Sequence, residues 1–166
     1  ARLGPHGGGD PCAGCGAVRV RRRGAPDDQQ GRSDPARPGR RYTSLVPTQL
    51  LRLLDADGSA LEALRGYDAV LVGGAALDAG LRARAEAAGV LIVTTYGMTE
   101  TAGGCVYDGM PLGGVRVRMD ADGRVVIGGP TVAAGYLDDP VATAAAFVEH
   151  NDGREFRTGD LGRWVD

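Results

Sequence analysis

The most chemically suggestive part of the chain is residues 94–101, which hold an aromatic ring, several hydroxyls and one carboxylate. The stretch reads Thr-Thr-Tyr-Gly-Met-Thr-Glu-Thr and follows the apolar run Val-Leu-Ile-Val at residues 90–93. A tyrosine ring can stack on a base, threonine hydroxyls can bond phosphate oxygens, and a glutamate can hold a metal ion. These residue types within eight positions predict a nucleotide site.

Two further segments carry side chains or backbone suited to the same ligand. Gly73-Gly74-Ala75 follows an apolar run, and glycine allows the backbone to approach a ligand closely. Arg157-Thr158-Gly159-Asp160 places a carboxylate among small residues, where it can accept hydrogen bonds from both ribose hydroxyls. Either segment alone is more often an ordinary turn. Their order around residues 94–101 strengthens the prediction of a nucleotide site.

The elements that position these segments form a βαβ unit. Apolar runs predict buried strands at 68–72 and 90–93, and between them Asp78 caps a helix that Gly89 ends. Parallel strands of such a unit bring their following loops to the same edge of the sheet. Upstream, the pattern predicts a short strand at 42–46, ended by Pro47, and a helix at 49–54 capped by Thr48.

The pattern changes after Tyr107 and favours antiparallel strands. Residues 114–119 alternate with period two, Asp122-Gly123 is a hairpin turn, and residues 124–127 form the return strand. A further short strand is expected to run to Tyr136, and Asp139-Pro140 begins a helix. The predicted class is α/β, with a parallel-sheet piece at 42–107 and a small antiparallel β-barrel piece at 108–166.

Residues 1–41 differ sharply in composition from the remainder. They hold nine Arg, four Asp, five Pro and nine Gly, and they show neither helical nor strand periodicity, which predicts disorder. Cys12 and Cys15 with His6 resemble half of a zinc site, but no second ligand pair follows. The Arg cluster could instead bind nucleic acid or phosphate, or the segment could have no chemical role.

The whole-chain composition restricts the class of protein. The 166 residues carry a formal net charge of −2, all 19 basic residues are Arg, and the three Cys have no disulfide-framework spacing. No apolar run approaches 18 residues and no signal peptide is visible at the N-terminus. We therefore expect a cytoplasmic protein without a membrane partner. The net charge argues neither for nor against a nucleic-acid partner, and we expect none.

The motifs together resemble the core motifs of the adenylate-forming acyl-CoA ligase superfamily, in order and with matching spacing over residues 42–166. The flanking segments 42–47 and 103–109 look most like the actinobacterial o-succinylbenzoate–CoA ligases within that superfamily, which serve menaquinone biosynthesis. The segments that carry the wider resemblance are Gly73-Gly74-Ala75, residues 95–100, Gly135-Tyr136 and residues 157–162.

The resemblance implies a two-step reaction, in which a carboxylate attacks the α-phosphate of ATP and the CoA thiolate then displaces AMP. It implies that Tyr96 stacks on adenine, Thr99 bonds the α-phosphate, Glu100 holds Mg²⁺, and Asp160 binds the ribose hydroxyls. The acid would be o-succinylbenzoate or another aryl or acyl carboxylate. The other nucleotide-binding positions implied are Gly73, Gly74, Ala75, Thr95, Gly97 and Met98.

The chain also departs from that family. The family's phosphate loop has no counterpart in residues 1–41, and its two functional lysines cannot be present because the chain contains no Lys. Arg does not replace a compact ammonium group at such a site. We expect an inactive fragment, and we interpret residues 1–41 as a region read out of frame. A non-catalytic nucleotide-binding module and a nucleic-acid binder acting through residues 1–41 remain alternative functions.

Overall fold

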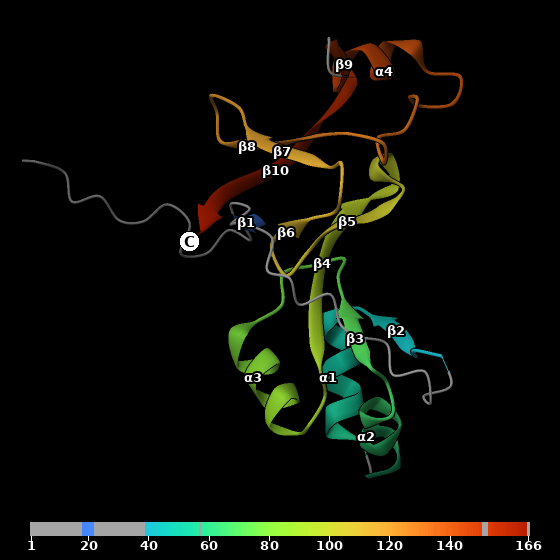
Figure 1. Cartoon of the computed structure of the whole chain (residues 1–166), viewed down its shortest axis with the longest axis vertical. Coiled ribbons are helices and arrows are strands. Elements are labelled where there is room, and N and C mark those ends of the chain that lie inside the picture. Colours follow the sequence, from blue (N-terminus) through green and yellow to red (C-terminus); the bar gives the residue numbers. More distant parts are fainter. Residues whose placement is uncertain (1–17, 22–38, 57, 151–152, 166) are drawn as a thin grey trace, which may run out of the picture.

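A computed structural model describes residues 18–21, 39–56, 58–150 and 153–165. The described residues form two five-stranded sheets, one carrying the parallel strands and the other mainly antiparallel (Figure 1). The predicted α/β class is confirmed, although no closed barrel forms among the described residues, since the second sheet is an open sheet. Within the same residues, no helix is long and apolar enough to cross a membrane.

The first sheet has the strand order β2-β3-β4-β5-β6. Its strands β2, β3 and β4 are parallel, whereas β5 and β6 are antiparallel additions at one edge. This confirms the predicted βαβ unit, in which α3 connects β3 to β4. The bounds are β2 Tyr42–Leu45, α1 Pro47–Asp55, α2 Gly58–Arg65, β3 Ala69–Val72, α3 Ala79–Ala87, β4 Ile92–Met98, η1 Thr99–Thr101, β5 Gly103–Tyr107 and β6 Met110–Pro111.

The second sheet has the strand order β1-β10-β8-β7, and β9 pairs with another part of β10. The β7–β8 hairpin confirms the predicted turn at Asp122-Gly123, where Gly123 adopts φ +78°. The Asp139 side chain accepts a hydrogen bond from the Ala142 amide and caps α4, as expected from the sequence. The bounds are β1 Val18–Arg21, β7 Arg116–Met119, β8 Arg124–Gly128, α4 Pro140–Ala146, β9 Phe147–His150 and β10 Gly153–Val165.

The described residues form two apolar cores. The first core lies between strands β3 and β4 and helices α1, α2 and α3, because the apolar positions of all five elements meet there; its buried residues are Leu50, Leu64, Val70, Val72, Ala85, Val90 and Ile92. The second core joins β5 to the β7–β8 hairpin and therefore links the two sheets; its buried residues are Cys105, Val106, Val115, Val125 and Ile127.

Three predictions about local structure were wrong. Over residues 18–21 the expected lack of regular structure was wrong, because β1 lies there and pairs in parallel with β10, burying Val20 completely; residues 1–17 and 22–38 lie outside the described residues. Alternating valines suffice for a strand when an existing strand edge supplies the hydrogen bonds. Thr48 does not cap α1, because Pro47 already occupies the first helical turn and the Gln49 side chain accepts from the Val46 amide. No strand forms between Gly129 and Tyr136.

The predicted loops at two motifs are also wrong. β4 does not end at Val93 but continues through residues 94–98, and residues 157–162 lie within the long strand β10. Both extensions have the same physical reason: an antiparallel partner, β5 for β4 and β8 for β10, continues the backbone pairing beyond the apolar run. Apolar periodicity does not predict such pairing, because the residues paired there include Thr95, Gly97 and Arg157, which do not continue an apolar run.

Candidate nucleotide site

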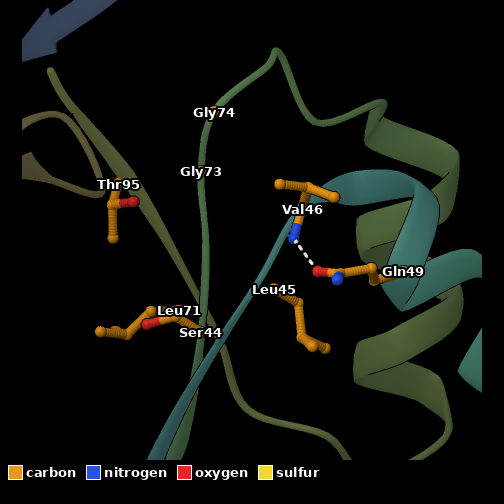
Figure 2. Close-up of a pocket in the computed structure, with 8 residues that line it drawn as sticks. All are labelled: Ser44, Leu45, Val46, Gln49, Leu71, Gly73, Gly74 and Thr95. Atoms are coloured by element: carbon orange, nitrogen blue, oxygen red, sulfur yellow. Dashed lines mark hydrogen bonds between the residues drawn. The ribbon is translucent and has the colours of Figure 1, made fainter.

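A hollow of about 270 Å³ lies where β3 ends beside β4 and the start of α1 (Figure 2). Gly73 must be glycine there, because a Cβ atom at this position would overlap the Thr95 hydroxyl. Gly74 adopts φ +77°, which glycine tolerates without strain. Ala75 is exposed and is not among the residues that line the hollow, which are Ser44, Leu45, Val46, Gln49, Leu71, Gly73, Gly74 and Thr95.

The central motif lies where β4 changes its pairing partner. Thr94 pairs with Val72 of the parallel strand β3, and Thr95 pairs with Tyr107 of the antiparallel strand β5. Asp108 supports this transition, because its Oδ1 accepts hydrogen bonds from the Thr94 amide and hydroxyl, both at 2.9 Å. Arg82 of α3 donates to the same oxygen at 3.0 Å. Sequence reasoning gave Asp108 no role.

A bulge follows within the same motif. The β4–β5 register shifts between Tyr96 and Gly97, and a Cβ atom at Gly97 would overlap the Gly103 carbonyl and lie 2.7 Å from the Cα atom of Gly104. The backbone of β4 therefore passes very close to that of β5. This close approach places the residues after Gly97 in the 3₁₀ turn η1, with Thr99 exposed and Glu100 half-buried.

A buried threonine holds the η1 turn. The Thr101 hydroxyl accepts a hydrogen bond from the Met98 amide at 3.0 Å, and its oxygen lies 2.9 Å from the Gly103 carbonyl, to which it can donate. Thr101 is completely buried, so the loss of these hydrogen bonds would leave polar backbone groups unsatisfied. Thr101 is a positioning residue that the sequence pattern did not reveal.

The structure joins the central motif to the third motif through Tyr96 and Asp160. The Tyr96 hydroxyl donates to Asp160 Oδ2 at 2.9 Å, although the two residues are 64 positions apart. Tyr96 is half-buried, and this burial is the main reason that its pKa is raised; the hydrogen bond to Asp160 raises the pKa further. The tyrosine therefore remains a neutral donor at physiological pH. An aromatic ring and a carboxylate are thus brought together, as a nucleoside would require.

A bulge in β10 positions Asp160. The β8–β10 register shifts between Arg157 and Leu161. Thr158, which is buried, donates through its hydroxyl to the Val125 carbonyl at 2.8 Å and accepts from the Asp160 amide at 3.1 Å. The bulge turns the Asp160 side chain out to an exposed position beside Tyr96.

Glu100, the predicted metal ligand, has a tyrosine partner of its own. The Tyr136 hydroxyl donates to Glu100 Oε1 at 2.8 Å, and this hydrogen bond raises the pKa of Tyr136. The Ala133 amide also donates to the Glu100 carbonyl at 2.9 Å. Sequence reasoning placed Tyr136 in a motif but assigned it no role; the Gly135-Tyr136 pair was the signal available.

The described residues contain no group of three His, Cys, Asp or Glu side chains that could hold a metal ion by themselves. This does not conflict with a magnesium role for Glu100, because Mg²⁺ commonly takes one or two carboxylates and completes its shell with phosphate oxygens and water. The donor chemistry of Glu100 fits that pattern. The alternative zinc half-site at His6, Cys12 and Cys15 lies outside the described residues.

The match to a family model identifies the class of protein. Residues 12–137 match the family described as AMP-binding enzyme, so the chain belongs to this family. The match begins at residue 12, ahead of Tyr42, where the motif resemblance was expected to begin. Residues 12–41, which belong to the segment of differing composition, therefore fall within the family match.

Among characterised proteins, the chain is 49% identical over 128 residues to a probable 2-succinylbenzoate–CoA ligase of Mycobacterium tuberculosis. That alignment covers 75% of this chain but 33% of the relative, so the chain spans about a third of its length. The expected superfamily resemblance is confirmed, including its o-succinylbenzoate–CoA ligase branch.

Two solved structures of adenylate-forming enzymes share the fold. The Klebsiella oxytoca NpsA N-terminal subdomain in complex with 3-hydroxyanthranilyl-AMSN superposes with a TM-score of 0.64 at 25% identity, covering 72% of this chain and 36% of that one. A malonyl-CoA ligase with methylmalonyl-CoA and AMP bound superposes with a TM-score of 0.57 at 29% identity, covering 75% and 35%.

Proposed function

We propose that this chain forms the AMP-facing part of an AMP-forming acid–CoA ligase. The observation that carries the proposal is the 2.9 Å hydrogen bond between Tyr96 and Asp160. It brings a stacking surface for adenine next to a carboxylate that can accept from ribose hydroxyls. Family membership supports the same reading, and the bound AMP of the malonyl-CoA ligase is consistent with it.

We assign a role to each of the candidate side chains. Tyr96 stacks on the base of ATP or AMP, Asp160 binds the ribose, and Thr99, which is exposed, bonds the α-phosphate. Glu100 would hold Mg²⁺, which when bound neutralises phosphate charge. The backbone of the remaining site positions surrounds the base and the acyl group: Gly73, Gly74, Ala75, Thr95, Gly97 and Met98.

We propose a two-step reaction for the whole enzyme. This chain spans about a third of the length of the Mycobacterium tuberculosis relative. The carboxylate oxygen of the acid attacks the α-phosphorus of ATP, forming acyl-AMP and releasing pyrophosphate. The thiolate of CoA then attacks the acyl carbon and AMP leaves. We propose o-succinylbenzoate as the acid, and hence a role in menaquinone biosynthesis, because the Mycobacterium tuberculosis relative bears that substrate in its name.

We further propose that the chain does not catalyse this reaction by itself. It contains no lysine, and an ammonium group that approaches the α-phosphate is part of the activity implied by the family resemblance. Nucleotide binding is a separate property, since the residues assigned to it are all present in the chain. Binding, and not turnover, is therefore the property to measure.

Isothermal titration with an acyl-sulfamoyl-adenosine mimic of o-succinylbenzoate tests the proposal. We expect saturable binding that Asp160→Ala weakens about tenfold, because the ribose hydroxyls lose a charged acceptor. Asp55→Ala, at the exposed C-terminal end of α1, is the matched control and should bind as the unsubstituted chain does. Equal affinity of all three proteins would contradict the assigned site, and no binding by the unsubstituted chain would contradict the proposed function.

The same titration with the mimic of a different aryl acid addresses the acid itself. Preference for the o-succinylbenzoate mimic would support the named substrate, and equal affinity for both mimics would argue against recognition of that acid by this chain. With either result, the effect of Asp160→Ala on affinity still tests the nucleotide part of the proposal.

A further inference from the structure

Glu100 is held by a segment that lies more than thirty residues further along the chain. The Tyr136 hydroxyl lies 2.8 Å from Glu100 Oε1, and the Ala133 amide lies 2.9 Å from the Glu100 carbonyl oxygen. One contact fixes the side chain and the other fixes the backbone of the same residue. The η1 turn is therefore attached to the segment between β8 and α4 at two points.

The backbone of Tyr136 is in turn fixed by α4. Its amide donates to the Thr143 hydroxyl at 2.9 Å, and that hydroxyl donates to the Asp139 carbonyl at 2.7 Å. Gly135 adopts φ +150° and packs so closely on Thr143 that a Cβ atom would lie 2.6 Å from its methyl group. The start of the capped helix thus determines where the Tyr136 backbone lies.

The ring of Tyr136 is fixed by the aromatic residues of the second sheet. It meets Phe147 edge-on, with ring centroids 5.4 Å apart and planes at 74°, and Phe147 packs on Phe156 at 4.9 Å. Phe147 and Phe156 are both buried. The Tyr136 ring is exposed on one side and is held on the other by its edge-on contact with Phe147, while its hydroxyl reaches Glu100.

We propose that Tyr136 is a positioning residue for Glu100 in magnesium-dependent nucleotide binding; this rests on the function proposed for Glu100. A carboxylate has about four lone-pair sites, so one hydroxyl donor leaves the others available to a cation. By holding Oε1, Tyr136 limits the rotation of the carboxylate and directs the remaining lone pairs. Partners of this kind that orient a metal ligand typically change metal affinity by 10- to 100-fold when removed.

The test measures the Mg²⁺ concentration that gives half-maximal binding of ATP, for the full chain and three variants. Tyr136→Phe keeps the ring packing and removes the donor, and we expect it to raise that concentration about tenfold. ATP affinity without Mg²⁺ should not change. Tyr42→Phe, at an exposed tyrosine on β2, is the matched control and should behave as the unsubstituted chain does.

Glu100→Gln separates failure of this inference from failure of the proposed function. If Glu100→Gln raises the required Mg²⁺ concentration and Tyr136→Phe does not, Glu100 is the magnesium ligand and the positioning role of Tyr136 is wrong. If neither variant nor the unsubstituted chain shows any dependence on Mg²⁺, the magnesium function of Glu100 is wrong, and the role of Tyr136 is wrong with it.

A second measurement reports on the contact without any nucleotide. The ¹³C NMR signal of the Glu100 carboxyl carbon in the free protein should move in Tyr136→Phe and stay in place in Tyr42→Phe. A signal that stays in place in Tyr136→Phe would overturn the proposal, because it would show that the hydroxyl does not hold the carboxylate.

Discussion

Strands β4 and β10 carry the two halves of the candidate site at equivalent irregularities, but they are built differently. Each strand keeps one antiparallel partner across its bulge, β5 for β4 and β8 for β10, but β4 also leaves the parallel strand β3 at Thr94, just before its bulge. Gly97 in β4 is packed against the backbone of β5, while a Cβ atom at Gly159 in β10 would meet nothing within 4 Å. The β4 bulge therefore requires glycine at position 97, whereas the β10 bulge has room for a side chain at position 159.

The two bulges also share one feature, a buried threonine whose hydroxyl bonds the backbone. Thr101 follows the β4 bulge and Thr158 lies in the β10 bulge, and they are the two buried polar residues of the described chain. Each hydroxyl bonds backbone groups beside the irregular pairing, the Met98 amide for Thr101 and the Val125 carbonyl for Thr158. The geometry around Glu100 therefore depends on a close backbone approach as well as on a buried hydroxyl, while the geometry around Asp160 depends on a buried hydroxyl without such an approach.

The largest effect is expected from Gly97→Ala. The added methyl group would overlap the Gly103 carbonyl and press on Gly104, and both neighbours are backbone, so the β4–β5 pairing must shift. We expect a loss of about 3 kcal/mol in the free energy of unfolding, measured by urea denaturation. Gly159→Ala is the matched control and should change stability by less than about 0.5 kcal/mol. Similar losses in both variants would remove the proposed difference between the bulges.

Thr158→Val should have the next largest effect, because it replaces the hydroxyl that organises β10 with a methyl group of similar size. The Val125 carbonyl and the Asp160 amide would both lose a buried partner, at a cost of about 2 kcal/mol. Thr158→Ser retains the hydroxyl and should lose less stability, which chemical denaturation of both variants can measure. If serine is as destabilising as valine, methyl packing and not hydrogen bonding holds this bulge.

A smaller effect is expected for the bond that joins the two motifs. Tyr96→Phe removes the hydroxyl that reaches Asp160, and Asp160→Ala removes the acceptor. A double-mutant cycle on the free energy of unfolding should give a coupling of about 1 kcal/mol, since the bond involves a charged acceptor at a half-buried position. A coupling near zero would show that the two motifs fold without a direct energetic connection.

The smallest effect concerns the regular part of β10, before its bulge. Arg118 bonds Glu155 and holds the pKa of that carboxyl below its ordinary value. A lowered pKa stabilises the fold above the ordinary glutamate pKa of about 4.3, and this stabilisation is lost as pH falls through the lowered pKa. Arg118→Met should therefore lose less than about 1 kcal/mol at pH 7, and this loss should become smaller as the pH is lowered to 3.

The measurement is the free energy of unfolding of both proteins at the two pH values. Because His150 Nε2 also lies 3.4 Å from Glu155 Oε2, His150→Gln in both backgrounds serves as the control for that contact. A difference between the two proteins that persists at pH 3 would mean that packing of the Arg118 stem, and not its charge, supports this part of β10.

The sequence predicted those elements whose signals lie within one short segment of the chain. Apolar runs identified β3 and the start of β4, Asp78 and Asp139 identified two helix starts, and Asp122-Gly123 identified the β7–β8 turn. These signals are local because a cap or a turn involves residues within four positions of one another. The motif residues of the candidate site were recognisable for the same reason, since each motif is contiguous.

Only the tertiary structure decided how these motifs meet. The extension of β4 and β10 through their motifs, the strand at Val18–Arg21, and the pairs Tyr96–Asp160 and Tyr136–Glu100 all join residues distant in sequence. Pairing with another strand depends on which backbone groups lie opposite, and the hydrophobic pattern of one segment does not contain that information. The sequence therefore contains the candidate site groups, and only folding determines which carboxylate accepts a hydrogen bond from each tyrosine.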